Sequence, residues 1–218
     1  IFAGGTAAGW VSGGALNPAV AFALDASSLS ISGFGASLPY ALFQCLGGAA
    51  AAVTFKSLHP SEYGAAVAAG SRQELKIKVA AEFIGTFFLC LTAGLSVLGG
   101  GRASGFAIAS ALMVMVYATG HLSGGHLNPA VTVAFLATER GIITNRQAGW
   151  YAASQLSGGL VAAAVYTPVA GDAFELGPGE GFGWLGVVSA ELTFTLALCY
   201  VVLAVTTYSK DMFGLAIG

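Results

Sequence analysis

Two short segments of the sequence carry residues suited to hydrogen bonding with a small polar molecule. Each contains the tripeptide Asn-Pro-Ala a few residues after a pair of glycines: Asn17-Pro18-Ala19 and Asn128-Pro129-Ala130. Asn is a preferred helix N-cap, and Pro suits the first helical turn because it lacks the N–H that would go unpaired there. We therefore expect a short helix to begin at each Asn, whose side-chain NH2 group stays available to bind a passing oxygen atom.

The apolar runs after Asn17 and Asn128 are too short to cross a bilayer, because charged residues follow at Asp25 and at Glu139. They are predicted to be re-entrant half-helices. The glycine runs before them would leave carbonyl groups unpaired, which a membrane permits only where the backbone lines a wet cavity or is buried in protein. Half-helices that enter from opposite sides direct their positive ends at one place and repel cations. The pattern favours a path for a neutral, hydrogen-bonding solute.

Two acidic residues, Glu82 and Glu191, lie inside apolar stretches. Acids within a membrane are functional by default, so a proton relay is one interpretation. The other is that both are buried structural carboxylates, one for each Asn-Pro-Ala segment, which accept hydrogen bonds from the loop backbones. We favour the structural role because the two acids occupy equivalent positions of an internal repeat. Gln44 and Gln155 recur beside glycine pairs, where helices can approach closely, and are predicted to serve packing.

Other residues with chemical potential are poorly arranged for catalysis or metal binding. His121 and His126 lie in one loop, but a metal site would need a third ligand, and only the distant His59 remains. Loop packing and hydrogen bonding are expected of them instead. The three cysteines lie singly in apolar stretches without metal-ligand spacing. Because no nucleophile–base pair, phosphate-binding loop or carboxylate pair is present, the sequence predicts neither an enzyme nor a bound cofactor or metal.

The composition indicates whether water or lipid surrounds the helices that carry these residues. Of 218 residues, 56% are hydrophobic and only 8% are charged, whereas an average soluble domain carries about 25% charged residues. A soluble globule is therefore excluded. The net charge of −2 gives no basic face for a nucleic-acid partner, and the high hydrophobicity excludes a disordered chain. Much of the apolar surface must face a lipid bilayer.

The apolar residues form stretches of the length that crosses a membrane, roughly 20 residues each. Five such spans are predicted, at 35–55, 79–99, 105–122, 147–168 and 184–207. Two shorter apolar stretches, 1–15 and 212–218, are each cut by a chain end and are interpreted as halves of one helix. The prediction is an all-α, multi-pass integral membrane protein.

The basic residues between the spans predict the orientation. Cytoplasmic loops are enriched in Lys and Arg. If the linker 56–78 is cytoplasmic, alternation of the loops leaves only Arg102 outside. The basic residues on the inner side are then Lys56, Arg72, Lys76, Lys78, Arg140, Arg146 and Lys210.

An internal repeat occurs in an unusual order. Glu191 follows Glu82 by 109 positions with similar neighbours, whereas Asn17 precedes Asn128 by 111. If residues 1–70 are moved behind Gly218, Asn17 follows Asn128 by 107 positions, and the repeat closes. Each half then has three spans, and an odd number of spans inverts the second half relative to the first. The two Asn-Pro-Ala segments would then meet in the middle of the membrane.

The segments that carry the repeat resemble the aquaporin, or major intrinsic protein, family over nearly the whole chain. The resemblance rests on residues 123–132, on 17–19 and on 81–87. It implies a six-helix, inverted-repeat transmembrane bundle with two re-entrant half-helices, in rotated order and with one helix split between the chain ends. The rotated order suggests a circular permutant or a window cut from a tandem array.

In the family's order, the resemblance divides this one channel domain into four parts. Residues 1–55 hold the end of helix 5, the second Asn-Pro-Ala loop and helix 6, and residues 56–78 form a cytoplasmic linker. Residues 79–168 hold helices 1 to 3 with the first Asn-Pro-Ala loop, and 169–218 hold an outer loop, helix 4 and the start of helix 5.

The resemblance also implies where the selectivity filter lies, at Ile108, Gly5, Gly14 and Val20. The arginine usual in the family is absent at the last of these positions. Val20 is similar to the residue in some plant vacuolar-type members. Two glycines and two aliphatic side chains predict a wide, weakly polar filter that passes water and, with it, ammonia, urea, glycerol or hydrogen peroxide.

Taken together, the residues and the resemblance predict a passive channel for water and small neutral solutes in a lipid bilayer. The resemblance alone implies that it is assembled as a homotetramer. The host membrane, plasma or vacuolar, stays open. The alternative is a pore-inactive structural or scaffolding protein of the same fold. Retention of both asparagines, with glycines at the filter, favours the open pore.

Overall fold

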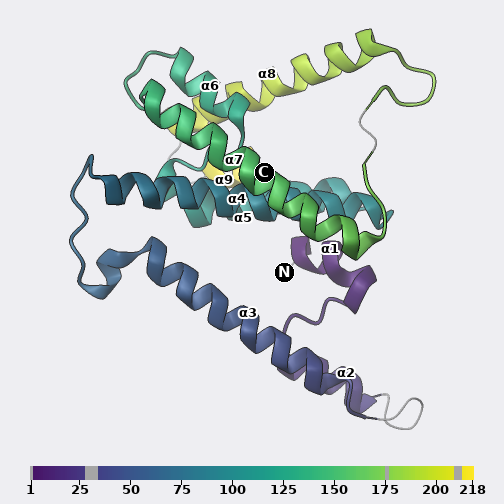
Figure 1. Cartoon of the computed structure of the whole chain (residues 1–218). Coiled ribbons are helices and arrows are strands. Elements are labelled where there is room, and N and C mark those ends of the chain that lie inside the picture. Colours follow the sequence, from purple (N-terminus) through teal and green to yellow (C-terminus); the bar gives the residue numbers. More distant parts are fainter. Residues whose placement is uncertain (1, 28–33, 175–176, 209–212) are drawn as a thin grey trace.

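The computed structural model describes residues 2–27, 34–174, 177–208 and 213–218, and its regular elements are helices, with no strand in those ranges. This confirms the prediction of an all-α protein. Residues 1, 210 and 212, which belong to the expectations above, lie outside the described part. Figure 1 shows the elements α1 (Phe2–Ser12), α2 (Pro18–Ser27), α3 (Ser37–Leu58), η1 (Pro60–Tyr63), α4 (Arg72–Leu98), α5 (Ser104–Ser123), α6 (Pro129–Ala137), α7 (Asn145–Ala170), α8 (Trp184–Tyr208) and α9 (Phe213–Ile217).

Four of the described helices, α3, α4, α5 and α8, are long and apolar enough to cross a membrane. The fifth predicted span, 147–168, does form a helix, since α7 has 26 residues, but it is not among the four. Its polar side chains lower its hydropathy, and two of them are used inside the protein. Ser154 donates to the carbonyl of Val79 at 2.6 Å, and Gln155 is buried against α4. A helix that hides a polar face against a neighbour need not be uniformly apolar.

The centre of the molecule is the group α4, α5 and α7, in which α4 packs against both others. Contact between α4 and α7 depends on a glycine, because a Cβ on Gly158 would stand 2.6 Å from the carbonyl oxygen of Phe83. On the far side of α7, the half-helix α6 and the end of α8 join a buried apolar cluster that includes Phe135, Tyr151 and Val202.

The two chain ends both pack on α5. Gly214 of α9 lies against Tyr117, and Gly218, which follows α9, lies against Ala109 and Met113. Beyond the first residue of α5, in the same direction, Thr6 of α1 lies near Gly101. The ends therefore follow one another along α5, as two halves of one helix would.

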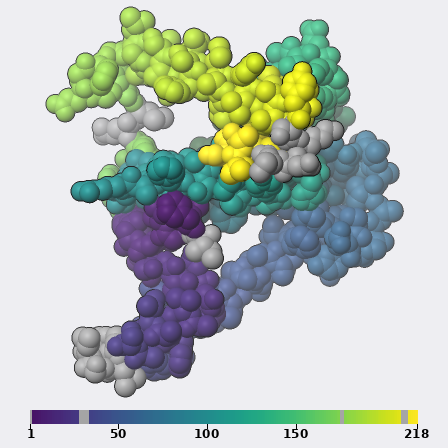
Figure 2. Space-filling view, turned by 180° about the vertical axis from the view of Figure 1, so that it is seen from behind, coloured from purple at the N-terminus to yellow at the C-terminus, as the bar shows by residue number. Residues whose placement is uncertain are grey.

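Two long helices stand away from this centre on opposite sides. Figures 1 and 2 both show α8 on one side of the α4–α5–α7 group and the α2–α3 pair on the other. Both helices expose large apolar side chains, with Phe43 of α3 exposed to 70% and Phe194 of α8 to 74%. In a membrane protein, such surfaces face lipid or further helices.

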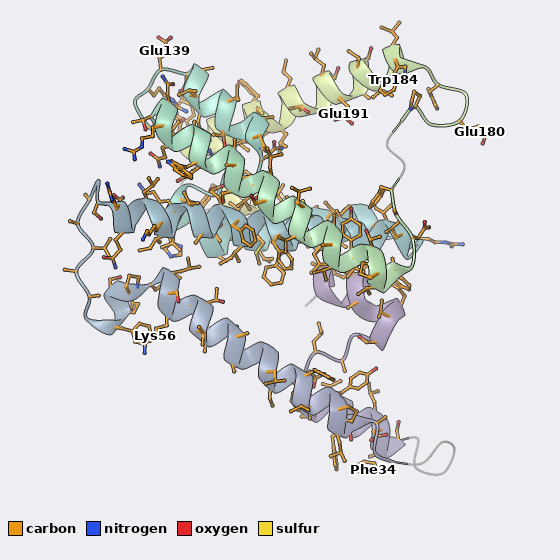
Figure 3. The ribbon with its side chains drawn as sticks, in the orientation of Figure 1. Phe34, Lys56, Glu139, Glu180, Trp184 and Glu191 are labelled. Atoms are coloured by element: carbon orange, nitrogen blue, oxygen red, sulfur yellow. The ribbon has the colours of Figure 1, made fainter. Side chains whose placement is uncertain are left out.

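The loops gather at two ends of the molecule. Lys56 and Glu139 lie at one end, whereas Phe34, Glu180 and Trp184 lie at the other (Figure 3). This separation is the one that alternating loops require. Together with the four apolar helices, this arrangement is that of an integral, multi-pass membrane protein.

Candidate functional site

The two loops that precede the Asn-Pro-Ala segments share one backbone conformation. The residues with positive φ are Gly13 (76°), Gly14 (64°) and Leu16 (52°) in one loop and Gly124 (97°), Gly125 (63°) and Leu127 (49°) in the other. A leucine in the left-handed region is uncommon and costs about 1–3 kcal/mol. No pattern in the sequence indicates that Leu16 and Leu127 are strained. Their equivalence shows that the internal repeat extends to the backbone.

Each loop ends at an asparagine that caps a short helix. Asn128 Oδ1 accepts a hydrogen bond from the N–H of Ala130 at 2.8 Å, and Asn17 Oδ1 accepts from the N–H of Ala19 at 2.9 Å. The proline after each Asn opens the helix, α6 or α2, at its first position. Within the described residues, the side-chain NH2 groups of both asparagines have no protein acceptor, so they can donate to a solute.

A buried carboxylate binds the loop before Asn128, here called the first loop. Glu82 of α4 is fully buried, and its Oε1 accepts from Ser123 Oγ at 2.6 Å and from the N–H of His126 at 3.0 Å. Its Oε2 accepts from the N–H of Leu127 at 2.7 Å and from Gln155 Nε2 at 2.8 Å. Four donors for one carboxylate compensate its removal from water. Gln155, assigned above to packing alone, is therefore a hydrogen-bonding member of the site.

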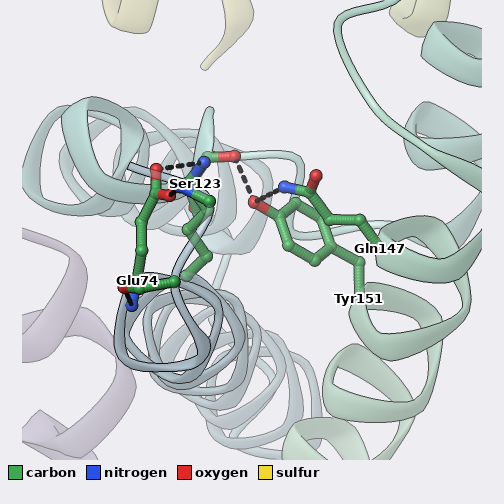
Figure 4. A network of polar contacts seen from close by, with 7 residues as sticks. Glu74, Ser123, Gln147 and Tyr151 are labelled. Atoms are coloured by element: carbon green, nitrogen blue, oxygen red, sulfur yellow. Dashed lines mark hydrogen bonds and ion pairs between the residues drawn. The ribbon is translucent and has the colours of Figure 1, made fainter. Parts of the chain in front are cut away.

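A second ring of contacts surrounds this network. Tyr151 of α7 donates to the carbonyl oxygen of Ser123 at 2.7 Å, and Gln147 donates to Tyr151 Oη at 3.2 Å (Figure 4). Sequence reasoning missed Tyr151, Gln147 and Ser123. Only the proximity of Ser123 to the motif, and the recurrence of glutamine in both halves, could have pointed to this network.

His126 has the role expected of it. Its ring is buried, its Nδ1 lies 3.1 Å from Thr132 Oγ1, and it stacks on Phe135 with centroids 4.4 Å apart. His121 differs from expectation. It lies at the end of α5, and its Nε2 is 3.0 Å from His59 Nε2, so the inference that His59 is too distant to join it is wrong. The return of the chain after α3 brings the two histidines together across 62 positions.

The loop before Asn17, here called the second loop, has the same backbone conformation but is exposed. Leu127 is 2% exposed because it packs on Gly85 of α4, whereas its equivalent Leu16 is 52% exposed. Gln44, with its amide oxygen turned to the loop, accepts from the N–H groups of Leu16 and Asn17 at 3.3 Å each. Glu191, however, is exposed. The structure does not bring it to this loop, because the end of α8 around Val202 packs on α6 while the rest stands free.

The four filter positions are brought together only in part. A Cβ on Gly14 would lie 3.3 Å from both the Cα and the carbonyl oxygen of Gly5, so these two glycines are in contact. Ile108 is half-buried on α5, which packs against the helix of Gly5. Val20 is 42% exposed on α2. The half of the molecule that carries Asn17 (the second half) is therefore less buried than the half that carries Asn128 (the first half).

A groove runs beside the second loop. It has a volume of about 710 Å³ and is lined by Leu16, Phe43, Gln44, Gly47 and Gly48, among others. In the first half, the equivalent face of α7, with its own glutamine and glycine pair, is covered by α4. The groove is therefore the counterpart of an occupied helix-packing site.

Comparison with known sequences identifies a family over the whole chain and individual relatives over about two thirds to three quarters of it. The family described as "Major intrinsic protein" matches twice, over residues 1–97 and 71–218. Aquaporin NIP1-3 of Oryza sativa subsp. japonica is 37% identical over 154 residues, which are 65% of this chain and 53% of that protein. Probable aquaporin NIP4-2 of Arabidopsis thaliana is 34% identical over 158 residues, or 65% and 54% of the two chains.

Aquaporin NIP2-1 of Zea mays is 34% identical over 175 residues, which are 74% of this chain and 58% of that protein. The chain therefore spans little more than half the length of the curated relatives it matches. All three names carry the NIP designation, which corrects the vacuolar-type resemblance expected from Val20.

Proposed function

This chain belongs to the major intrinsic protein family, and from that premise we propose that it forms a passive channel for water and small uncharged solutes across a lipid bilayer. Its relatives are named aquaporins, which agrees with the expectation that it is not an enzyme. Flow through such a channel is driven only by osmotic or concentration gradients.

The observation that carries the proposal is the pair of loops with one backbone conformation. Each presents the NH2 group of an asparagine, Asn17 or Asn128, at the positive end of a half-helix. A helix N-terminus bears about half a positive charge, so the two ends would oppose a cation once the assembled channel brings them to face one point. A neutral solute avoids that barrier and can accept hydrogen bonds from both asparagines. Pore width, lining groups and half-helix dipoles are the accepted basis of selectivity in aquaporins.

The solute range follows from the filter positions. Gly5 and Gly14 lie in contact and add no side chain, and Val20 and Ile108 are apolar. A constriction made of these residues is wide and offers few hydrogen-bonding groups. We assign to it water together with glycerol, urea, ammonia and hydrogen peroxide.

A pore with a complete wall requires that a helix fill the groove beside the second loop. In the first half, Glu82 reaches its loop from a helix packed against Gln155 and Gly158. The equivalent helix is α8, with Glu191. Seated in the groove beside Gln44, Glu191 would accept from the backbone of the second loop as Glu82 does from the first. This gives Glu191 its structural role in the assembled channel.

The order of the segments is proposed to be rotated relative to other family members. The support is the position of α9 and α1, which follow one another along α5. In the assembled protein they would form one helix, through the join of neighbouring copies in a tandem array or of the two ends of one domain. The homotetramer implied by the family resemblance would cover the exposed apolar face of α3.

The test is stopped-flow light scattering of proteoliposomes under gradients of sucrose, then of glycerol and urea. Fast shrinkage in sucrose, followed by rapid re-swelling in glycerol or urea, is expected. An Asn128→Asp variant, which places a carboxylate at the end of α6, should keep water flux and acquire a proton leak. If sucrose gives no flux above empty liposomes, the protein is not a channel and the scaffolding alternative replaces this proposal. Water flux without re-swelling would limit the channel to water.

A further inference from the structure

Two histidines outside the pore network meet at the surface. His59 follows the last turn of α3, and His121 lies in the last turn of α5. Their Nε2 atoms are 3.0 Å apart, and their rings stack with centroids 5.1 Å apart. His59 is half-buried and His121 is exposed, so an ion can reach both from solvent. Nothing in the proposed channel mechanism uses this pair.

The contacts of His59 decide which of its nitrogens carries the proton. Its Nδ1 lies 3.1 Å from the carbonyl oxygen of Phe55, and a carbonyl can only accept. Nδ1 is therefore the donor, and the Nε2 of the neutral ring presents a lone pair toward His121. Stacking on Phe55, with centroids 4.1 Å apart, fixes the ring plane. A backbone carbonyl that holds Nδ1–H and orients Nε2 is the usual outer partner of a metal-binding histidine.

We propose that His59 and His121 form a two-histidine site for a divalent transition-metal ion, with Cu²⁺ and Ni²⁺ favoured over Zn²⁺. In the metal-free pair, His121 Nε2–H donates to His59 Nε2. When a metal ion binds, His121 changes tautomer, so that its proton moves from Nε2 to Nδ1, and the ion is bound by the Nε2 lone pairs of both rings. Imidazole suits copper, nickel and zinc, whereas Mg²⁺ and Ca²⁺ take oxygen ligands.

The distance between the two nitrogens in the metal-free pair suits Cu²⁺ and Ni²⁺ with little movement of the rings. With metal–nitrogen bonds of about 2.05 Å, a spacing of 3.0 Å corresponds to an angle of about 94° at the metal. Square-planar and octahedral geometries, which suit Cu²⁺ and Ni²⁺, have neighbouring ligands near 90°. A tetrahedral Zn²⁺ site would need the nitrogens about 3.35 Å apart.

The cation nearest in sequence, Lys56, interacts with another side chain. Lys56, one turn before His59, points its ammonium over the ring of Tyr63, 5.1 Å from the centroid. Within the described ranges, no group of three or more His, Cys, Asp or Glu side chains could hold a metal. The protein therefore supplies two ligands, and water completes the coordination. A bound ion would tie the end of α3 to α5 directly before the loop that Glu82 holds.

The test is isothermal titration of detergent-purified, untagged protein with Cu²⁺ and with Ni²⁺, and with Mg²⁺ as the metal control. Wild type is expected to bind one Cu²⁺ or Ni²⁺ per chain. His59→Ala and His121→Ala should each weaken binding by more than about tenfold, since even the loss of an outer-shell partner costs that much. Ser57→Ala is the matched control, because Ser57 is exposed in the same turn and only bonds its own helix at Val53.

A spectroscopic readout identifies the ligands independently of affinity. Electron paramagnetic resonance of the Cu²⁺ form should show hyperfine coupling to two imidazole nitrogens, reduced to one in either single variant. Circular dichroism verifies that each variant is folded. The proposal is overturned if the double variant His59→Ala/His121→Ala binds as tightly as wild type, or if the wild-type spectrum shows no nitrogen ligand from these rings.

Discussion

At the scale of single residues, the same sequence pattern has two different outcomes. Glu82 and Glu191 are equivalent in the repeat, as are Leu127 and Leu16, yet only the first of each pair is buried. The difference arises from what lies opposite each of them. Glu82 faces four hydrogen-bond donors, and Leu127 faces the bare backbone of Gly85. Residue type therefore defines which contacts a side chain can make, and the neighbouring residues define whether those contacts form.

Replacing Glu82 with Gln tests its structural role. One acceptor oxygen becomes an NH2 group that faces other donors, and each buried group left unpaired costs about 1–3 kcal/mol. We expect a lower Tm and a lower yield of folded protein, with solute selectivity unchanged per folded channel. Thermal unfolding and liposome flux measure the two quantities. Glu180→Gln, in an exposed loop, is the control and should change the Tm little. Normal yield with altered selectivity would instead support the proton-relay interpretation.

At the scale of elements, glycines set how closely helices approach. Gly158 lets α7 touch the backbone of α4 at Phe83, and this contact brings Gln155 within 2.8 Å of Glu82. The neighbouring Gly159 has a looser environment, since a Cβ there would lie 3.6 Å from Cys90 Sγ. The pair therefore has one position that requires glycine and one that does not.

Gly158→Ala should separate α7 from α4. Its methyl group would overlap a carbonyl oxygen, which backbone movement must relieve at a cost of about 1–3 kcal/mol. Gly159→Ala is the matched control and should be neutral or stabilising, because Ala is favoured over Gly inside a helix by up to about 1 kcal/mol. Denaturant unfolding in detergent compares the two variants. Equal stabilities of Gly158→Ala and Gly159→Ala would contradict the packing described here.

At the scale of the whole molecule, one half is assembled and the other is open. The first half has its loop, half-helix and carboxylate together, while α8 and the α2–α3 pair lie on opposite sides of the centre (Figure 2). The apolar groove beside Gln44 and the exposed apolar side of α8 are complementary in chemistry. A further helix must pack on the half that carries Asn17 before the wall of the pore is complete.

A protein with two copies of this sequence joined head to tail tests the rotated order. Joining Gly218 of the first copy to Ile1 of the second would make α9 and α1 one helix. We expect higher water flux per copy than for the single chain, because a complete unit then exists in the usual order. The control joins the copies through a long flexible Gly/Ser linker, which supplies proximity without a continuous helix. Equal flux per copy in all three proteins would refute the rotation.

The lipid environment, the helices and the first residues of the half-helices can all be predicted from the amino-acid sequence. These follow from composition, from runs of apolar residues, and from the local chemistry of Asn and Pro, and none of them depends on distant parts of the chain. Which distant groups meet is visible only in the folded protein. Gln155 and Ser123 donate to Glu82, Glu191 is exposed, and His59 lies beside His121. The reason is that such contacts depend on how closely helices pack and on which side each helix lies, and a local pattern records neither.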